Sequence, residues 1–130
     1  NNLGNVEEER EQFEDALYWY ERARGLNRHA PTPLLNSLGI VCLRSPSEFS
    51  LHDRARLLHF VDDITTLLSS QTLGAQDRAY MVRRLDENPA FAPARGHAAW
   101  KKIRRWIERR PDLEARARTA PKTQPIAQRA

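Results

Sequence analysis

Histidines and adjacent acidic residues are the side chains through which this sequence could bind a metal or transfer a proton. The four histidines lie far apart in the chain, at His29, His52, His59 and His97. No His-Glu-x-x-His motif places two metal ligands on one helix face. Asp62 and Asp63 are neighbours, and on a helix their side chains point about 100° apart, so they cannot converge on one atom. We therefore expect no metal site, no cofactor and no catalytic residues, and the chain is predicted not to be an enzyme.

Cysteine and glycine are the other residues whose chemistry depends on clustering. Cys42 is the single cysteine, so it can form neither an internal disulfide nor a thiolate metal cluster. It lies in an apolar stretch and is predicted to be a small core residue. The five glycines are dispersed along the chain, and no glycine-rich phosphate-binding loop is indicated.

The elements that must position any site are helices. Apolar residues recur every three or four positions, and no alternating pattern typical of strands extends beyond a few residues. The spacing predicts an all-α protein, with a first helical hairpin over 3–26 and further helices over 34–43, 51–68, 76–85 and 93–110. Residues 1–110 are expected to form one domain. Residues 111–130 are expected to form a basic, proline-containing tail, largely disordered apart from a turn or two of helix at 112–118.

A repeat with a period of 35 residues is visible in the sequence. Asn2-Leu3-Gly4 recurs as Ser37-Leu38-Gly39 and as Thr72-Leu73-Gly74. The second copy fits only in its first helix, and the third Leu-Gly pair is interpreted as a coincidence. Features typical of the junction between two repeats appear instead at 85–86 and 91–94.

The first copy carries the most specific pattern. Leu3-Gly4 is followed by Ala16, Tyr20 and Ala23, and the small residues Gly4 and Ala16 allow two antiparallel helices to cross closely. Residues 1–27 thus resemble a tetratricopeptide repeat (TPR). A pentatricopeptide array has the same period and binds RNA, but this set of residues favours the tetratricopeptide family.

The resemblance implies a short α-solenoid of TPR-like antiparallel hairpins, a scaffold or adaptor that binds a peptide or a partner protein. The chain is then expected to begin within a repeat and to be the C-terminal end of a longer protein. First helices line the groove in this family, which makes Asn1, Asn5 and Asn36 candidate peptide contacts. The basic residues of the family's clamp for chaperone C-termini are missing, so that activity is not expected.

An amphipathic segment over 100–110 indicates a second candidate site. Its apolar side is formed by Trp100, Ile103, Trp106 and Ile107. Its basic side, the candidate anion contact, is formed by Lys101, Lys102, Arg105 and Arg109. We expect the apolar side to cap the solenoid. Two alternative functions stay open: a module that binds nucleic acid or an anionic surface through this segment, and a regulatory segment of a larger enzyme.

Composition and charge limit the classes of partner. The chain has 130 residues, of which 40% are hydrophobic and 29% charged, as in an ordinary globular domain. Residues 92–130 carry eleven basic and three acidic side chains, whereas the formal net charge of the whole chain is +4. The C-terminal end therefore suits an anionic partner. Because no apolar run approaches the ~18 residues of a spanning helix and no signal-peptide pattern opens the chain, we expect no membrane span. A soluble, cytoplasmic protein is favoured, while compartment and oligomeric state stay open.

Overall fold

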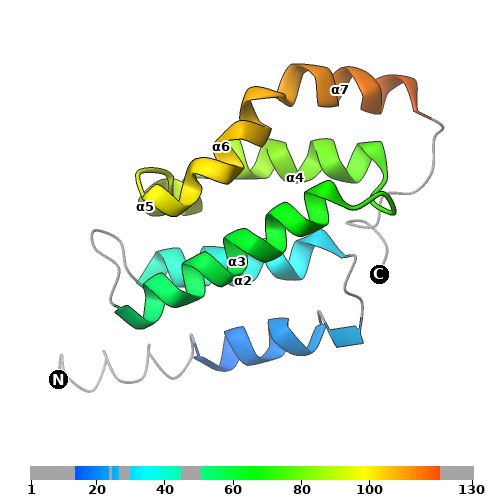
Figure 1. Ribbon diagram of the computed structural model, residues 1–130. Helices are drawn as coiled ribbons and strands as arrows, with labels where there is room; N and C mark the ends of the chain where they lie inside the picture. Colours follow the sequence, from blue (N-terminus) through cyan, green and yellow to red (C-terminus); the bar gives the residue numbers. More distant parts are fainter. Residues whose placement is uncertain (1–13, 24, 27–29, 45–50, 121–130) are drawn as a thin grey trace, which may run out of the picture.

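The computed structural model describes residues 14–23, 25–26, 30–44 and 51–120, and every regular element in this part of the chain is helical (Figure 1). Residues 14–23 form the first helical segment. The elements that follow are α2 (Pro31–Arg44), α3 (Leu51–Ser69), α4 (Ala75–Glu87), η1 (Pro89–Phe91), α5 (Ala92–Arg95), η2 (Ala98–Trp100), α6 (Lys101–Glu108) and α7 (Arg110–Thr119). The predicted all-α class is confirmed for the described residues.

The first helical segment, α2, α3 and α4 alternate in direction along the chain, whereas α7 continues in the same general direction as α6 (Figure 1). Apolar spacing decides which face of each helix is buried. Pro31 and Pro33 open α2, where a missing amide hydrogen removes no helical hydrogen bond. The core residues of α2 and α3 recur at three- and four-residue steps: Leu34, Leu35, Leu38, Val41, Cys42, Leu57, Val61, Ile64 and Leu68. These two helices pack directly on each other, and α3 runs back along α2 (Figure 1).

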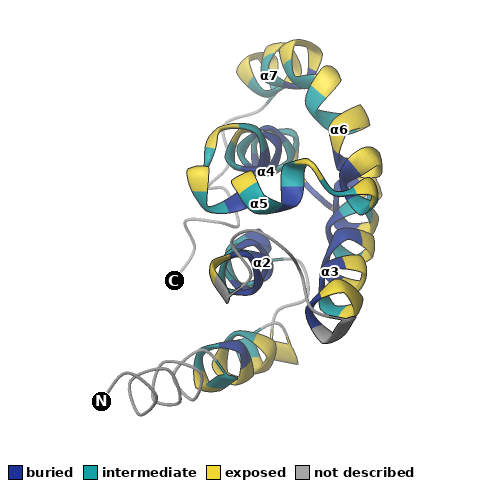
Figure 2. Ribbon diagram, turned by 90° about the vertical axis from the view of Figure 1, so that its left-hand side faces the viewer, coloured by how far each residue is buried: buried dark blue, intermediate teal, exposed yellow. Residues whose placement is uncertain are grey.

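The helices are arranged in two layers. α2 contacts α3 and α4, and α6 likewise contacts α3 and α4. Figure 2 shows α2 and α4 stacked in one layer, with α3 and α6 side by side in the other. α7 lies across the outer side of α4 and is the most extensive partner of that helix. One core cluster extends from Leu17 in the first helical segment to Leu113 in α7.

The segment over 93–110, predicted as one helix, is broken into α5, η2 and α6. His97 adopts an extended conformation, and its Nδ1 accepts a hydrogen bond from the backbone N–H of Ala99, 3.1 Å away. This side-chain cap begins a new turn, so it competes with continuation of the preceding helix. The break redirects the chain so that Trp100, 1% exposed, packs near Phe91 with ring centroids 6.1 Å apart.

The short helix expected at 112–118 is part of a longer one, α7, so the expected tail is helical over 111–119. Leu113 is buried against the core, and α7 packs along α4. The expectation of disorder over 121–130 lies outside the described residues. None of the described helices has the length and apolar composition needed to cross a lipid bilayer.

Candidate functional site

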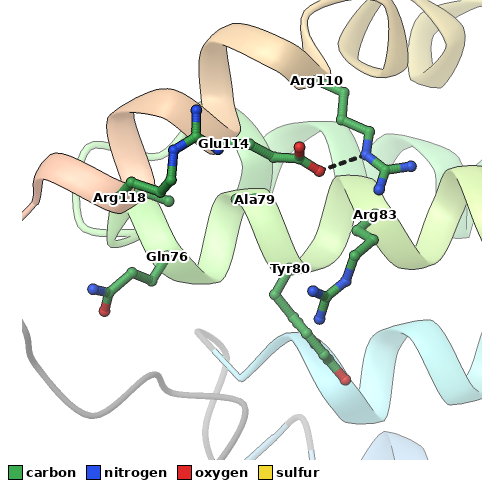
Figure 3. A pocket seen from close by; sticks show the side chains of 8 residues that line it. Gln76, Ala79, Tyr80, Arg83, Arg110, Glu114 and Arg118 are labelled. Carbon is green, nitrogen blue, oxygen red and sulfur yellow. Dashed lines mark hydrogen bonds and ion pairs between the residues drawn. The ribbon is translucent and has the colours of Figure 1, made fainter.

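An open groove of about 410 Å³ lies between α4 and α7 (Figure 3). From α4 it is lined by Gln76, Ala79, Tyr80 and Arg83, and from α7 by Arg110, Glu114, Ala117 and Arg118. These positions recur at three- and four-residue steps, so each set lies on one helix face. The small side chains of Ala79 and Ala117 leave the space between the longer ones unfilled.

Arg110 fixes the α7 wall of the groove. Its guanidinium pairs with Asp86 at 2.9 Å, Glu87 at 2.7 Å and Glu114 at 2.6 Å, joining α4 to α7. The hydrogen bonds that Arg110 donates to Glu114, Glu87 and Asp86, in that order of size, raise the pKa of Arg110 above its ordinary value. Its positive charge is therefore neutralised within the protein and is not offered to a ligand.

Arg83 and Arg118 are the exposed cations of the groove. Within the described parts of the chain, neither guanidinium forms an ion pair. Figure 3 shows Arg83 extending from α4 beside Tyr80 and Arg118 extending from α7 near Gln76, so the two charges lie at different ends of the groove and point away from each other. An arginine presents five N–H donors in a planar fork that matches a carboxylate.

Tyr80 connects the groove to α2. The Arg84 guanidinium donates from Nη1 to the Tyr80 hydroxyl at 3.2 Å and from Nη2 to the Asn36 Oδ1 at 3.3 Å. Asn36 is half-buried, and its amide oxygen already accepts this bond. The structure thus places Asn36 beside the groove helix α4, while the candidates Asn1 and Asn5 lie outside the described residues.

The predicted amphipathic division of 100–110 is present. Trp100 and Ile103 are buried, and Trp106 and Ile107 pack partly buried against the core. The four candidate anion contacts are all exposed: Lys101, Lys102, Arg105 and Arg109. Two of these four are already engaged, because Lys102 Nζ lies 3.4 Å from Asp62 Oδ1 and Arg109 stacks 4.3 Å from the Trp106 ring centroid.

A second hollow, of about 330 Å³, lies between the first helical segment and α3. Its wall is the bidentate pair of Arg56 with Glu14, at 3.0 and 2.9 Å, and the hydrogen bond to Glu14 raises the pKa of Arg56. Tyr18 lines the hollow and Trp19 lies beside it, both more than half exposed. Their rings meet edge to face at 5.4 Å, an apolar surface at the edge of the molecule.

The residues with catalytic potential are not brought together in the described parts of the chain. Burial raises the pKa of the Cys42 thiol to about 12, so the thiol stays protonated and in the core, as predicted. His59 pairs with Asp63 at 3.2 Å on an exposed helix face, and His97 serves as a cap. No group of three metal-ligating side chains is present among the residues that the structure describes.

Sequence reasoning missed the groove because its two walls are separated by more than twenty residues and meet only through helix packing. The sequence does indicate the helix that forms the α7 wall, because Arg110 and Glu114 are four residues apart, a spacing at which opposite charges pair on a helix. It indicates a helix over 110–119, but not the helix on which it packs. No family model, curated protein or solved structure matches the chain.

Proposed function

We propose that this chain is a non-catalytic protein-interaction module, which binds an acidic peptide segment of a partner protein in the groove between α4 and α7. The observation that carries the proposal is that two exposed arginines with no ion pair among the described residues, Arg83 and Arg118, line one open groove from its two helices. Carboxylate side chains or a C-terminal carboxylate are the groups that complement such a pair.

The size and lining of the groove support a peptide as the occupant. A volume of about 410 Å³ accommodates a few side chains of an extended segment. Tyr80, half-buried, offers an aromatic ring to the apolar part of such a segment, and Gln76 offers an amide to its backbone. The combination of polar donors with apolar surface suits a peptide better than an inorganic anion.

The helix pairing supports a TPR-like arrangement of the module. α2 with α3 corresponds to one hairpin, and α4 with α6 corresponds to the next. The first helices of the two hairpins, α2 and α4, contact each other, and so do the second helices, α3 and α6. This is how neighbouring repeats stack in a solenoid. In such an arrangement the segment over 100–110, expected from the sequence to be the cap, supplies the second helix of the last hairpin, and α7 is the capping helix. The groove then lies between this cap and the first helix of the last hairpin.

The test is the affinity of a short fluorescent peptide rich in Asp and Glu, measured by anisotropy, with a Lys-rich peptide of the same length as the control ligand. Arg83→Glu combined with Arg118→Glu is expected to weaken binding of the acidic peptide at least about tenfold, because each change removes a charge-assisted hydrogen bond and adds repulsion. Circular dichroism should show unchanged helicity, since both side chains are exposed.

Lys101→Glu combined with Arg105→Glu is the matched control, because it makes the same change in net charge on α6, outside the groove. This variant is expected to bind the acidic peptide within about twofold of the unaltered protein. Equal weakening by both double variants would mean that net charge alone attracts the peptide, and the proposal would fail. Absence of binding to any acidic peptide would contradict it directly.

A further inference from the structure

Three arginines that do not line the groove belong to α4, to the junction of α6 with α7, and to α7: Arg78, Arg109 and Arg116. Arg109 precedes α7, and Arg116 lies seven residues later, about two helical turns along the same side as the buried Leu113. Arg78 lies near the start of α4, which α7 covers. Burial lowers the pKa of Arg78, and the charges of Arg109 and Arg116 lower it further, so each of these two arginines lies close enough to repel Arg78.

Arg78 is held in place by the end of α3. Its guanidinium donates to the carbonyl oxygens of Leu68 at 2.8 Å, Ser70 at 2.8 Å and Leu73 at 3.2 Å. These bonds satisfy acceptors around the α3 C-terminus but bring no negative charge. Since Arg78 cannot turn away, the repulsion from its two neighbours is built into the fold.

No carboxylate neutralises this cluster within the described residues. Arg78, Arg109 and Arg116 form no ion pair there, and neither do the nearby acids Glu108 and Asp112. The neighbouring Arg110 differs from them, because it forms ion pairs with three carboxylates. The cluster has the charge distribution of a site whose counter-ion comes from a ligand.

The cluster continues along α6 as a line of positive charge. Lys101, Arg105 and Arg109 are four residues apart, so about 6 Å of helix rise separates each from the next on one exposed face. Lys101 and Arg105 form no ion pair with any described residue. Stacking on Trp106 restrains Arg109 at the point where the line meets the cluster.

From this juxtaposition we propose that the basic stripe, consisting of Lys101, Arg105, Arg109, Arg116 and Arg78, binds the phosphate backbone of nucleic acid without reading its sequence. Successive phosphates supply evenly spaced negative charges, and guanidinium groups bind phosphate oxygens through paired donors. The stripe is distinct from the peptide groove and does not depend on the proposed function.

The apolar side of α6 argues for nucleic acid over a lipid surface. Ile103 is buried, and Trp106 and Ile107 pack partly buried against the core, so the apolar side of α6 is turned toward the protein and not toward a bilayer interface. Burial likewise removes the Trp100 ring as a stacking platform for bases, and Arg109 already stacks on the Trp106 ring. Binding through phosphates alone predicts little preference among sequences and a steep dependence on salt.

The test is the affinity of mixed-sequence duplex DNA for the whole chain, measured by anisotropy between about 50 and about 200 mM salt. With about four phosphate contacts, affinity is expected to fall about a hundredfold over this range. Lys101→Glu with Arg105→Glu should abolish binding at the higher salt. The milder change Arg109→Gln with Arg116→Gln should reduce the salt dependence by about one charge per residue replaced.

Arg83→Glu with Arg118→Glu is the control with the same change in net charge, and it should leave the affinity for DNA within about threefold. Equal loss in this control would overturn the stripe as the site, and so would DNA binding that is insensitive to salt. Binding to phosphatidylserine vesicles without binding to DNA would overturn the choice of ligand. Because the peptide and DNA assays use opposite double variants, failure of one proposal is distinguishable from failure of the other.

Discussion

Individual arginines in this protein differ in function according to their partners. Arg110 forms ion pairs with three carboxylates and joins α4 to α7, and Arg56 is paired with Glu14. Arg83 and Arg118, equally charged, have no such partner within the described residues. Residue type alone does not separate these two groups, so sequence reasoning assigned the basic character to 100–110 and overlooked Arg83 and Arg118.

Cys42 provides a chemical test of the core. Its side chain is fully buried, and burial raises the pKa of its thiol to about 12. The reactive thiolate is therefore almost absent at pH 8, and we expect the folded protein to resist alkylation by iodoacetamide. Unfolding in urea should return the pKa to its ordinary range and make modification complete. Rapid modification under native conditions would show that α2 is not packed as described.

The central helices were predictable because each carries a continuous apolar stripe. The predicted 51–68 and 76–85 correspond to α3 and α4 within one or two residues at each end. α7 was not predictable in the same way, since Leu113 is its one buried side chain and the rest of its contact uses small or charged residues. The break at His97 depends on a cap, which an apolar pattern does not reveal.

Leu113 should therefore decide whether α7 stays in place. The side chain is 4% exposed, and Leu113→Ala is expected to cost about 2–4 kcal/mol of unfolding free energy through lost burial and the cavity left behind. Urea denaturation measures this change. Leu58→Ala is the matched control, since Leu58 is 51% exposed on α3 and should cost less than about 1 kcal/mol. Similar values for both variants would contradict the packing of α7 on α4.

The packing of α7 on α4 distinguishes two basic surfaces, the groove and the basic stripe, that charge counts along the sequence do not distinguish. The chain's C-terminal end is rich in lysine and arginine, and this much is evident from the charge counts. Which of those charges face a groove and which form the basic stripe depends on the pairing of α4 with α7. That pairing joins segments far apart in sequence, so spacing along the chain could not predict it.

The measurement that tests the central claim most directly is mapping of amide chemical-shift changes by NMR while an acidic peptide is added. If the groove is the peptide site, the largest changes cluster on α4 and α7 around Gln76, Arg83 and Arg118, with little change along the exposed face of α6. Changes confined to α6, or to the hollow beside Tyr18, would contradict the claim that the groove between α4 and α7 is the peptide site.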